Sequence, residues 1–263
     1  MNDLLRVSSH DAVAHIHLNR PEVHNALNAD LIAALHDAFV GLAAEPPEAL
    51  RAVVLAGEGA TFCAGADIAW QRAAMALSMA ENEADAARLQ QMLTAIDECP
   101  APVIARVHGV ALGGGMGLCA VADVVLAAAG TTFGFTETKL GIMPAVISPF
   151  VLAKIGETHA RALFPPGARF DAERARQIGL VHEVLPDLDA LDSRVDAIIG
   201  ELLSAGPTAA RGAKEVIRDQ RGMPRQEALE LAVERAARQR VSAEGQEGLS
   251  AFLDKRRPTW RRD

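Results

Sequence analysis

Two glycine-containing segments each follow an apolar run and lead into a predicted helix. They are the loop FCAGAD, residues 62–67, and the run LGGGMG, residues 112–117. The first N–H groups of a helix have no partner within it and lie at the positive end of the helix dipole. Because glycine lacks a Cβ, another molecule can approach such a backbone closely. Either segment alone is typical of a tight turn, but the pair predicts an oxyanion hole, in which two amides stabilise one developing negative charge.

A carboxylate stands in a third apolar segment, FGFTETKLGIM, residues 133–143. Removal from water raises the pKa of a carboxyl group toward the range that general acid–base catalysis uses. An oxyanion hole makes an enolate accessible, and the reaction then depends on the group that moves protons. We therefore expect Glu137 to be the catalytic acid and base, with a solvated loop glutamate as the alternative reading.

The elements that would carry these residues alternate between strands and helices in the first half of the chain. Short apolar or alternating runs predict strands, and amphipathic patterns predict helices. The expected strands are residues 12–18, 52–56, 101–107 and 122–129, with a short one near 132, and the expected helices are residues 29–43, most of 68–98 and the segment after the glycine run. Beyond about residue 150 the chain reads as nearly all helical. This order predicts an α/β core rich in parallel strands, followed by a helical extension.

The composition restricts the class of protein. Of 263 residues, 50% are hydrophobic and 23% are charged, as is typical of soluble globular proteins. No apolar run approaches the ~18 residues of a transmembrane helix, and no signal peptide is evident, so no membrane partner is expected. The net charge of −8 argues against nucleic acid as a partner. Three widely separated cysteines favour a reducing, cytoplasmic location.

Five segments together resemble the crotonase superfamily, that of the enoyl-CoA hydratases and isomerases. They run in order from about residue 12 to about residue 260: LNRPEVHNALN, TFCAGADI, VHGVALGGGMGL, FGFTETKLGIMPAV and EGLSAFLDKRRPTW. Each is moderately specific, and the combination is highly specific. The resemblance implies an α/β fold, a crotonase-like spiral of ββα units with the acyl-CoA site in residues 1–195, and a C-terminal helical trimerisation region in residues 196–263.

The same resemblance implies roles for individual residues. The N–H groups of Ala64 and Gly114 would hold the carbonyl oxygen of an acyl-CoA thioester. The CoA site would be lined by Ala64, Gly65, Ala66, Asp67 and Gly114, with Phe252 and Lys255 approaching the CoA of a neighbouring subunit. The assembly would be a homotrimer or a dimer of trimers. No metal or redox cofactor is implied, since coenzyme A is part of the substrate.

The sequence departs from the family's hydratase pattern at one catalytic position. Typical hydratases carry two glutamates, and here Glu137 stands at the second position while Gly117 occupies the first. The resemblance predicts an enoyl-CoA hydratase, a lyase, in which Glu137 acts alone or with an acid from another element. The alternatives are a Δ3,Δ2-enoyl-CoA isomerase with a single glutamate and a non-catalytic acyl-CoA-binding protein.

The segment ETKLGIMPAVISPFVLAKIG resembles a narrower branch, that of the methylglutaconyl-CoA and isohexenylglutaconyl-CoA hydratases of leucine and acyclic-terpene breakdown. This resemblance predicts a branched or carboxylated enoyl-CoA as substrate. A substrate carboxylate would need a cation, for which Lys139 and Lys154 are candidates. The favoured reading of both is an ordinary surface lysine.

Overall fold

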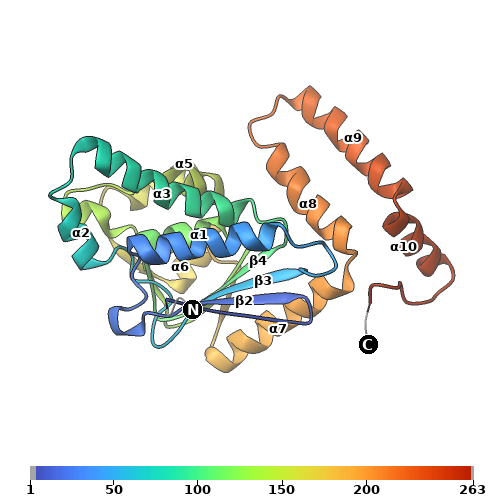
Figure 1. Ribbon diagram of the computed structural model, residues 1–263, viewed down its shortest axis with the longest axis horizontal. Coiled ribbons are helices and arrows are strands. Elements are labelled where there is room, and N and C mark those ends of the chain that lie inside the picture. The colour runs from blue at the N-terminus through green and yellow to red at the C-terminus, as the bar shows by residue number, and fades with distance from the viewer. Residues whose placement is uncertain (1–3, 262–263) are drawn as a thin grey trace.

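The computed structural model describes residues 4–261 and is built around a six-stranded sheet (Figure 1). The strands lie in the order β1 (Leu5–His10), β2 (Val13–Leu18), β3 (Ala52–Gly57), β4 (Val103–Val107), β6 (Val124–Ala128) and β9 (Glu183–Leu185). β1 pairs antiparallel with β2, and the other pairs are parallel. The predicted parallel-rich core is confirmed, although the sequence patterns did not predict β1 or β9.

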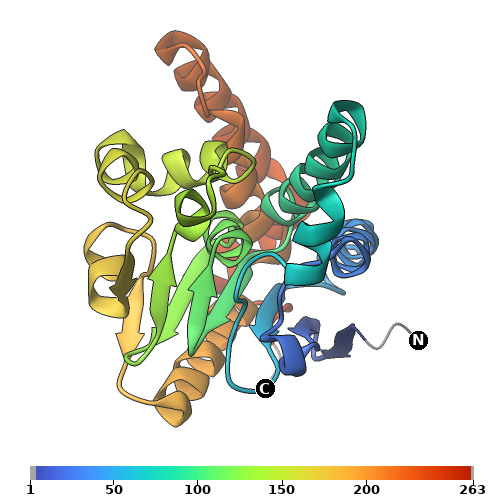
Figure 2. The same cartoon turned by 90° about the vertical axis from the view of Figure 1, so that its left-hand side faces the viewer.

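Helices cover both faces of this sheet. α1 (Ala29–Ala43), α3 (Met79–Asp97), α4 (Gly114–Val121) and α5 (Ser148–Leu163) share one hydrophobic core with one face, and α7 (Leu188–Ser204) packs on the other. Figure 2 shows α7 in orange on the opposite side of the sheet from α4 in green. Successive side chains of a strand point to opposite faces, so Val53 and Leu55 join the larger core while Ala52 and Val54 contact α7.

A second, three-stranded sheet fixes the relative position of two predicted site segments. Its strands are β5 (Val110–Leu112), β7 (Thr132–Gly134) and β8 (Arg169–Asp171), in the order β5-β7-β8. β5 and β7 are parallel, and their last residues, Leu112 and Gly134, are partners in the register. The glycine run and the segment that carries Glu137 therefore leave the sheet side by side.

The predicted helical stretch 68–98 forms two helices, α2 (Ile68–Ala74) and α3, separated by a turn. Ser78 caps α3 in a capping box: its hydroxyl accepts the N–H of Glu81 at 3.3 Å, and the Glu81 carboxylate accepts the N–H of Ser78 at 2.8 Å. Two N–H groups at the start of α2 are also capped, because the Asp67 side chain accepts them from Ala69 and Trp70. The two helices form one wall of the cavity described below.

The last three helices form an arm that extends away from the core (Figure 1). They are α8 (Pro207–Asp219), α9 (Arg225–Val241) and α10 (Ala243–Leu253), and only Pro207 and Ala251 are buried within them. The predicted boundary between residues 195 and 196 falls inside α7, whose Leu191, Val195 and Ile198 pack on the sheet. Between residues 4 and 261, no helix combines the length and the hydropathy needed to span a bilayer.

Candidate active site

One cavity, of about 300 Å³, brings together most of the predicted site residues. Its wall includes both glycine segments, the 3-10 helix η2 (Thr136–Leu140), parts of α2 and α3, and residues 142–147. Of the predicted residues, Ala64, Gly65, Ala66, Gly114 and Glu137 line it. The cavity therefore joins the two predicted amide donors to the predicted acid.

Most of the amides in the first glycine segment are already used by the protein. The N–H of Ala64 donates to the carbonyl oxygen of His24 at 3.0 Å. The N–H of Gly65 donates to the thiol of Cys63, which is fully buried and whose pKa is raised to about 12 by that burial. Ala64, predicted as an oxyanion donor, therefore has no free proton to offer, and that assignment is wrong.

The amide of Ala66 is the one left free in this segment. Ala66 forms a parallel bridge with Leu27, in which Leu27 donates to the oxygen of Gly65 at 2.7 Å and accepts from Asp67 at 2.9 Å. Successive N–H groups of an extended chain point to opposite sides, so the N–H of Ala66 points away from Leu27. No residue within the described part of the chain accepts it, and the donor therefore lies two residues beyond the predicted one.

The second predicted donor, Gly114, lies at the start of α4. Gly113, with φ of +48°, turns the chain into α4 and donates its own N–H to Gly134 at 3.0 Å. The helical bonds begin only with the amides of Met116 and Gly117, both of which reach the oxygen of Gly113. The N–H of Gly114 thus belongs to the first turn of α4, and none of the residues 4–261 accepts it.

The glycines are required because the two segments are in backbone contact. A Cβ on Gly115 would lie 2.5 Å from the carbonyl oxygen of Cys63, and one on Gly65 would lie 3.0 Å from that of Leu112. A Cβ on Gly114 would lie 2.7 Å from a methyl carbon of Leu27. This close approach brings the free amides of both segments to the same wall of the cavity.

Glu137 lies directly beside this pair of turns. Its Oε1 would be 3.5 Å from a Cβ built on Gly113. Its other oxygen, Oε2, is buried and has no hydrogen-bond partner among the described residues. Burial raises the pKa of Glu137 above its ordinary value, although a hydrogen bond from its own backbone amide opposes the shift. The arrangement suits a group that exchanges a proton with a bound molecule.

Apolar side chains surround Gly117, the position at which the hydratase pattern would have a second glutamate. A Cβ on Gly117 would lie 2.6 Å from Cγ2 of Ile147 and 3.4 Å from Cδ2 of Leu93. Any larger residue at 117 would require Ile147 to move, while an added Cβ would be in van der Waals contact with Leu93. Glu137 is therefore the carboxylate at this end of the cavity.

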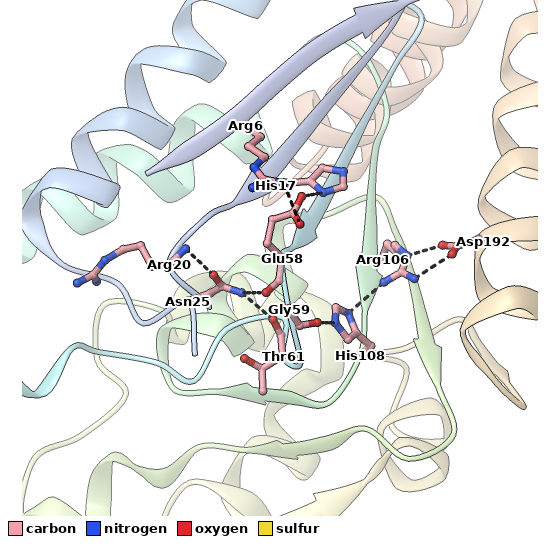
Figure 3. Close-up of polar contacts among 10 residues, drawn as sticks. All are labelled: Arg6, His17, Arg20, Asn25, Glu58, Gly59, Thr61, Arg106, His108 and Asp192. Atoms are coloured by element: carbon pink, nitrogen blue, oxygen red, sulfur yellow. Dashed lines mark hydrogen bonds and ion pairs between the residues drawn. The ribbon is translucent and has the colours of Figure 1, made fainter. Parts of the chain in front are cut away.

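A network of buried polar side chains holds the loop that leads to the first glycine segment (Figure 3). The amide nitrogen of Asn25 donates to the carbonyl oxygens of Glu58 and Thr61, at 2.9 and 2.7 Å, and its oxygen accepts the N–H of Arg20 at 2.8 Å. Asn25 is fully buried, so these bonds form away from competing water. They fix residues 58–61 against the turn after β2.

His108 anchors the same loop from the end of β4 (Figure 3). A guanidinium N–H of Arg106 donates to its Nδ1 at 3.1 Å, so the proton of the neutral ring lies on Nε2, which donates to the oxygen of Gly59 at 2.9 Å. Arg106 in turn pairs with Asp192 on α7. Desolvation lowers the pKa of His108, and the adjacent Arg106 adds to this effect, while the hydrogen bond to Gly59 opposes it. The net lowering of the pKa favours the neutral ring.

Asp67, predicted to line the CoA site, is not among the residues that line the cavity and instead bonds to the start of α2 and to Arg20. Its carboxylate accepts the N–H groups of Ala69 and Trp70, at 2.8 and 3.2 Å, and pairs with Arg20 at 2.8 Å. Burial would raise the pKa of Asp67, but these bonds hold it below the ordinary value. The geometry gives Asp67 a structural part in orienting α2 and the preceding turn.

The remaining predicted residues lie away from the cavity. Phe252 is 80% exposed on α10, and Lys255 follows the end of that helix. Lys139 is exposed, and Lys154 donates to the oxygen of Ala122 at 2.6 Å beside a different cavity. Neither lysine is among the residues that line the cavity of Glu137.

The sequence analysis missed one ionisable residue in the wall, Asp85 on α3. Its surroundings in the sequence, MAENEADAARLQQ, are largely polar and give no sign that this acid faces inward. Its spacing to the buried Met92 and Ile96, seven and eleven residues further on, is the signal that could have found it.

Comparison with known proteins agrees with this geometry. Residues 8–263 match the sequence profile described as enoyl-CoA hydratase/isomerase. The chain is 31% identical over 249 residues to the crotonyl-CoA hydratase of Syntrophomonas wolfei, covering 94% of each chain. This protein belongs to the enoyl-CoA hydratase/isomerase family.

Solved structures place the fold in the same family. Pseudomonas aeruginosa AtuE is similar with a TM-score of 0.95 and 35% identity, covering 98% of this chain and 100% of that one. An enoyl-CoA hydratase from Shewanella pealeana is similar with a TM-score of 0.92 and 34% identity, covering 98% and 96%. The α/β fold predicted from the sequence, that of the crotonase superfamily, is confirmed.

Proposed function

We propose that this protein is an enoyl-CoA hydratase that adds water across the 2,3 double bond of an acyl-CoA thioester. The observation that carries the proposal is the buried, unpartnered Oε2 of Glu137 beside a turn with free amides, among the residues described. Such an oxygen is a suitable acceptor for a reacting water molecule. The names of the relatives support the same reaction.

In this proposal the amides of Ala66 and Gly114 bind the thioester oxygen. Water addition at C3 moves the electron pair of the double bond through C2 to that oxygen, which becomes an enolate. Two donors aimed at this oxygen stabilise the enolate more than the ground state. Removing one such donor costs about 2.7–4 kcal/mol of transition-state stabilisation.

Glu137 then serves both proton transfers. Its carboxylate takes a proton from water as the oxygen of that water bonds to C3, and it returns the proton to C2 when the enolate collapses. The balance is the addition of one water molecule, with no oxidation or reduction. Because Gly117 provides no second acid, the Glu137 carboxylate performs both proton transfers. That the reaction needs no metal or redox cofactor stays a prediction.

We propose an uncharged, branched acyl group as the substrate class. The cavity wall supports this through apolar side chains such as Leu89, Met143 and Ile147, and none of the described residues that line it is a lysine, arginine or histidine. The carboxylated acyl groups considered from the sequence would have no positive partner there. A place in leucine breakdown and a cytoplasmic location both stay predictions.

The test is hydration of crotonyl-CoA, 3-methylcrotonyl-CoA and 3-methylglutaconyl-CoA in water labelled with ¹⁸O. We expect the label in 3-hydroxyacyl-CoA from the first two, and a loss of about 10²–10⁴-fold in kcat for Glu137→Gln. Failure of all three thioesters to incorporate label would refute the hydratase. Full activity of Glu137→Gln would refute the role of this residue.

The second candidate is a Δ3,Δ2-enoyl-CoA isomerase. The packing of Ile147 and Leu93 against Gly117 favours it, because a dry wall at that point suits transfer of one proton between two carbons. Interconversion of 3-enoyl and 2-enoyl thioesters without uptake of ¹⁸O would select the isomerase. Binding of acyl-CoA with neither reaction would select the non-catalytic alternative.

We also propose that the arm forms the contacts of a homotrimer or a dimer of trimers. Large apolar side chains on it are exposed, among them Ile217, Val233, Val241, Phe252 and Leu253. An exposed apolar surface of this kind is typical of an interface between subunits. Phe252 and Lys255 would reach the CoA site of a neighbour only in such an assembly.

A further inference from the structure

Asp85 occupies a position of α3 at which an apolar residue is expected. The other buried residues of this helix are Met92, Leu93 and Ile96, and Asp85 continues the same face toward the N-terminus. Asp85 is only 8% exposed. Burying a carboxylate costs free energy unless it is well paired, so the position indicates a role beyond packing.

The pairing of Asp85 is incomplete. Its Oδ1 accepts a hydrogen bond from Nη2 of Arg88 at 2.6 Å, but the Arg88 side chain is 52% exposed, so the charge of this partner is well solvated. No residue in the described part of the chain bonds to Oδ2. One oxygen of Asp85 therefore remains available to the cavity that Asp85 lines.

Asn82, one helical turn before Asp85, adds another acceptor to this wall. Its amide nitrogen donates to the carbonyl oxygens of Leu77 and Ser78, each at 3.1 Å, which leaves Oδ1 as the group for a ligand. This end of the cavity is therefore rich in acceptors and negative in charge.

Asp85 lies away from the reacting atoms. Leu93 marks the end near Gly117, where its Cδ2 would be 3.4 Å from an added Cβ. Asp85 is eight residues earlier on α3, a separation of about 12 Å along the helix axis. It faces the far part of an acyl chain rather than the double bond.

We propose that Asp85 is a specificity-determining residue for the far end of the acyl group. It accepts a hydrogen bond from an acyl chain that carries a hydroxyl group there, and it repels one that carries a carboxylate. The proposal rests on the proposed function, since it takes the cavity to hold the acyl chain of a CoA thioester.

The test measures binding of three saturated thioesters of equal chain length to the full-length assembly by calorimetry. They are hexanoyl-CoA, 6-hydroxyhexanoyl-CoA and adipoyl-CoA. We expect the hydroxylated thioester to bind most tightly, and adipoyl-CoA about tenfold or more weaker than hexanoyl-CoA, because like charges are brought together. Asp85→Asn should remove most of the adipoyl penalty, and Asp85→Leu should also remove the preference for the hydroxyl group.

Glu83→Gln is the matched control, because Glu83 is exposed on the same helix and its replacement changes the net charge equally. It should leave all three affinities in the same ratio. An adipoyl penalty that is absent from the wild type, or that survives Asp85→Asn, would overturn the proposal. Because these thioesters are not hydrated, their binding without any hydration of crotonyl-CoA would refute the proposed function alone.

Discussion

At the scale of single residues, the candidate site departs from the rules that stabilise a protein. Glu137 has a buried oxygen without a partner among the described residues, and Asp85 replaces an apolar residue on a core-facing stripe. Both arrangements are costly in free energy, because a charged group leaves water without full compensation. Such departures are common where a protein binds or transforms a ligand.

We expect Glu137→Gln to stabilise the fold increasingly as the pH rises. Burial raises the folded-state pKa of Glu137, so the folded protein holds this proton more tightly than the unfolded chain, and stability falls as the pH rises through the folded pKa. Glutamine stays neutral and avoids this loss. Thermal unfolding between about pH 5 and pH 8 should show a widening gap in Tm. A gap that does not change with pH would contradict the prediction.

The sequence predicted both glycine segments that line the cavity, but not which amide of the first segment is free. Which N–H is available depends on the bridge between Leu27 and Ala66 and on the bond from Ala64 to His24. These contacts join segments that are far apart in the chain, so local patterns cannot reveal them. Glu137 and Gly114 could be predicted to lie together because each closely follows a strand whose apolar pattern is clear, and both line the cavity.

At the scale of elements, backbone contacts fix the geometry of the first glycine segment and of α4. The close approach of Gly115 to Cys63 leaves no room for a methyl group, and the oxygen it would meet belongs to the main chain. A side chain could rotate away, whereas this oxygen could move only with the backbone of the first glycine segment. The turn and the helix are therefore joined rigidly.

We expect Gly115→Ala to destabilise the protein by about 1–3 kcal/mol, the usual cost of overpacking. The control is Gly212→Ala in the interior of α8, where an added Cβ meets no atom within 4 Å. That replacement should stabilise α8 by about 0.5–1 kcal/mol through helix propensity. Chemical denaturation measures both, and equal effects of the two variants would refute the packing argument.

His108 should make the stability of the loop that leads to the first glycine segment, residues 58–61, depend on pH. Its folded-state pKa is lowered, mainly by desolvation, so the unfolded chain binds this proton more readily and stability is lost as the pH falls below neutral. His108→Gln should reduce the fall in unfolding free energy between about pH 7 and pH 5. His15 and His182 shift in the same direction, so part of the slope should remain. A fall in unfolding free energy that is as large in His108→Gln as in the wild type would contradict the prediction.

At the scale of the whole molecule, the arm is an extended structure attached to a well-packed core. The alternation of strands and helices predicted the core, and the late cluster of helices predicted the arm. The sequence did not show that α7 belongs to the core, since its amphipathic pattern is compatible with packing on a sheet or on another helix. The order of the strands also depends on long-range pairing that no local pattern contains.

We expect Ile217→Glu combined with Val233→Glu to convert the assembly to monomers. The two side chains are 68% and 71% exposed in the single chain, so a charge at these positions is tolerated there but is costly in an apolar interface. Light scattering coupled to gel filtration measures the mass, and circular dichroism checks the fold. Glu230→Gln, on the same helix as Val233, should keep the wild-type mass. A wild type that is already monomeric would refute the proposed assembly.

The pairing of Leu112 with Gly134 has a consequence for how this protein could be altered. Glu137 follows the end of β7, and α4 follows the end of β5, which is paired with β7. The distance between Glu137 and the start of α4 therefore depends on the main chain and not on the identity of nearby side chains. The opposite wall, from α2, α3 and residues 142–147, consists of side chains that take no part in that pairing. Substitutions in the wall can therefore change which thioester is accepted while the reacting groups keep their spacing, which makes it the natural target for a library of variants.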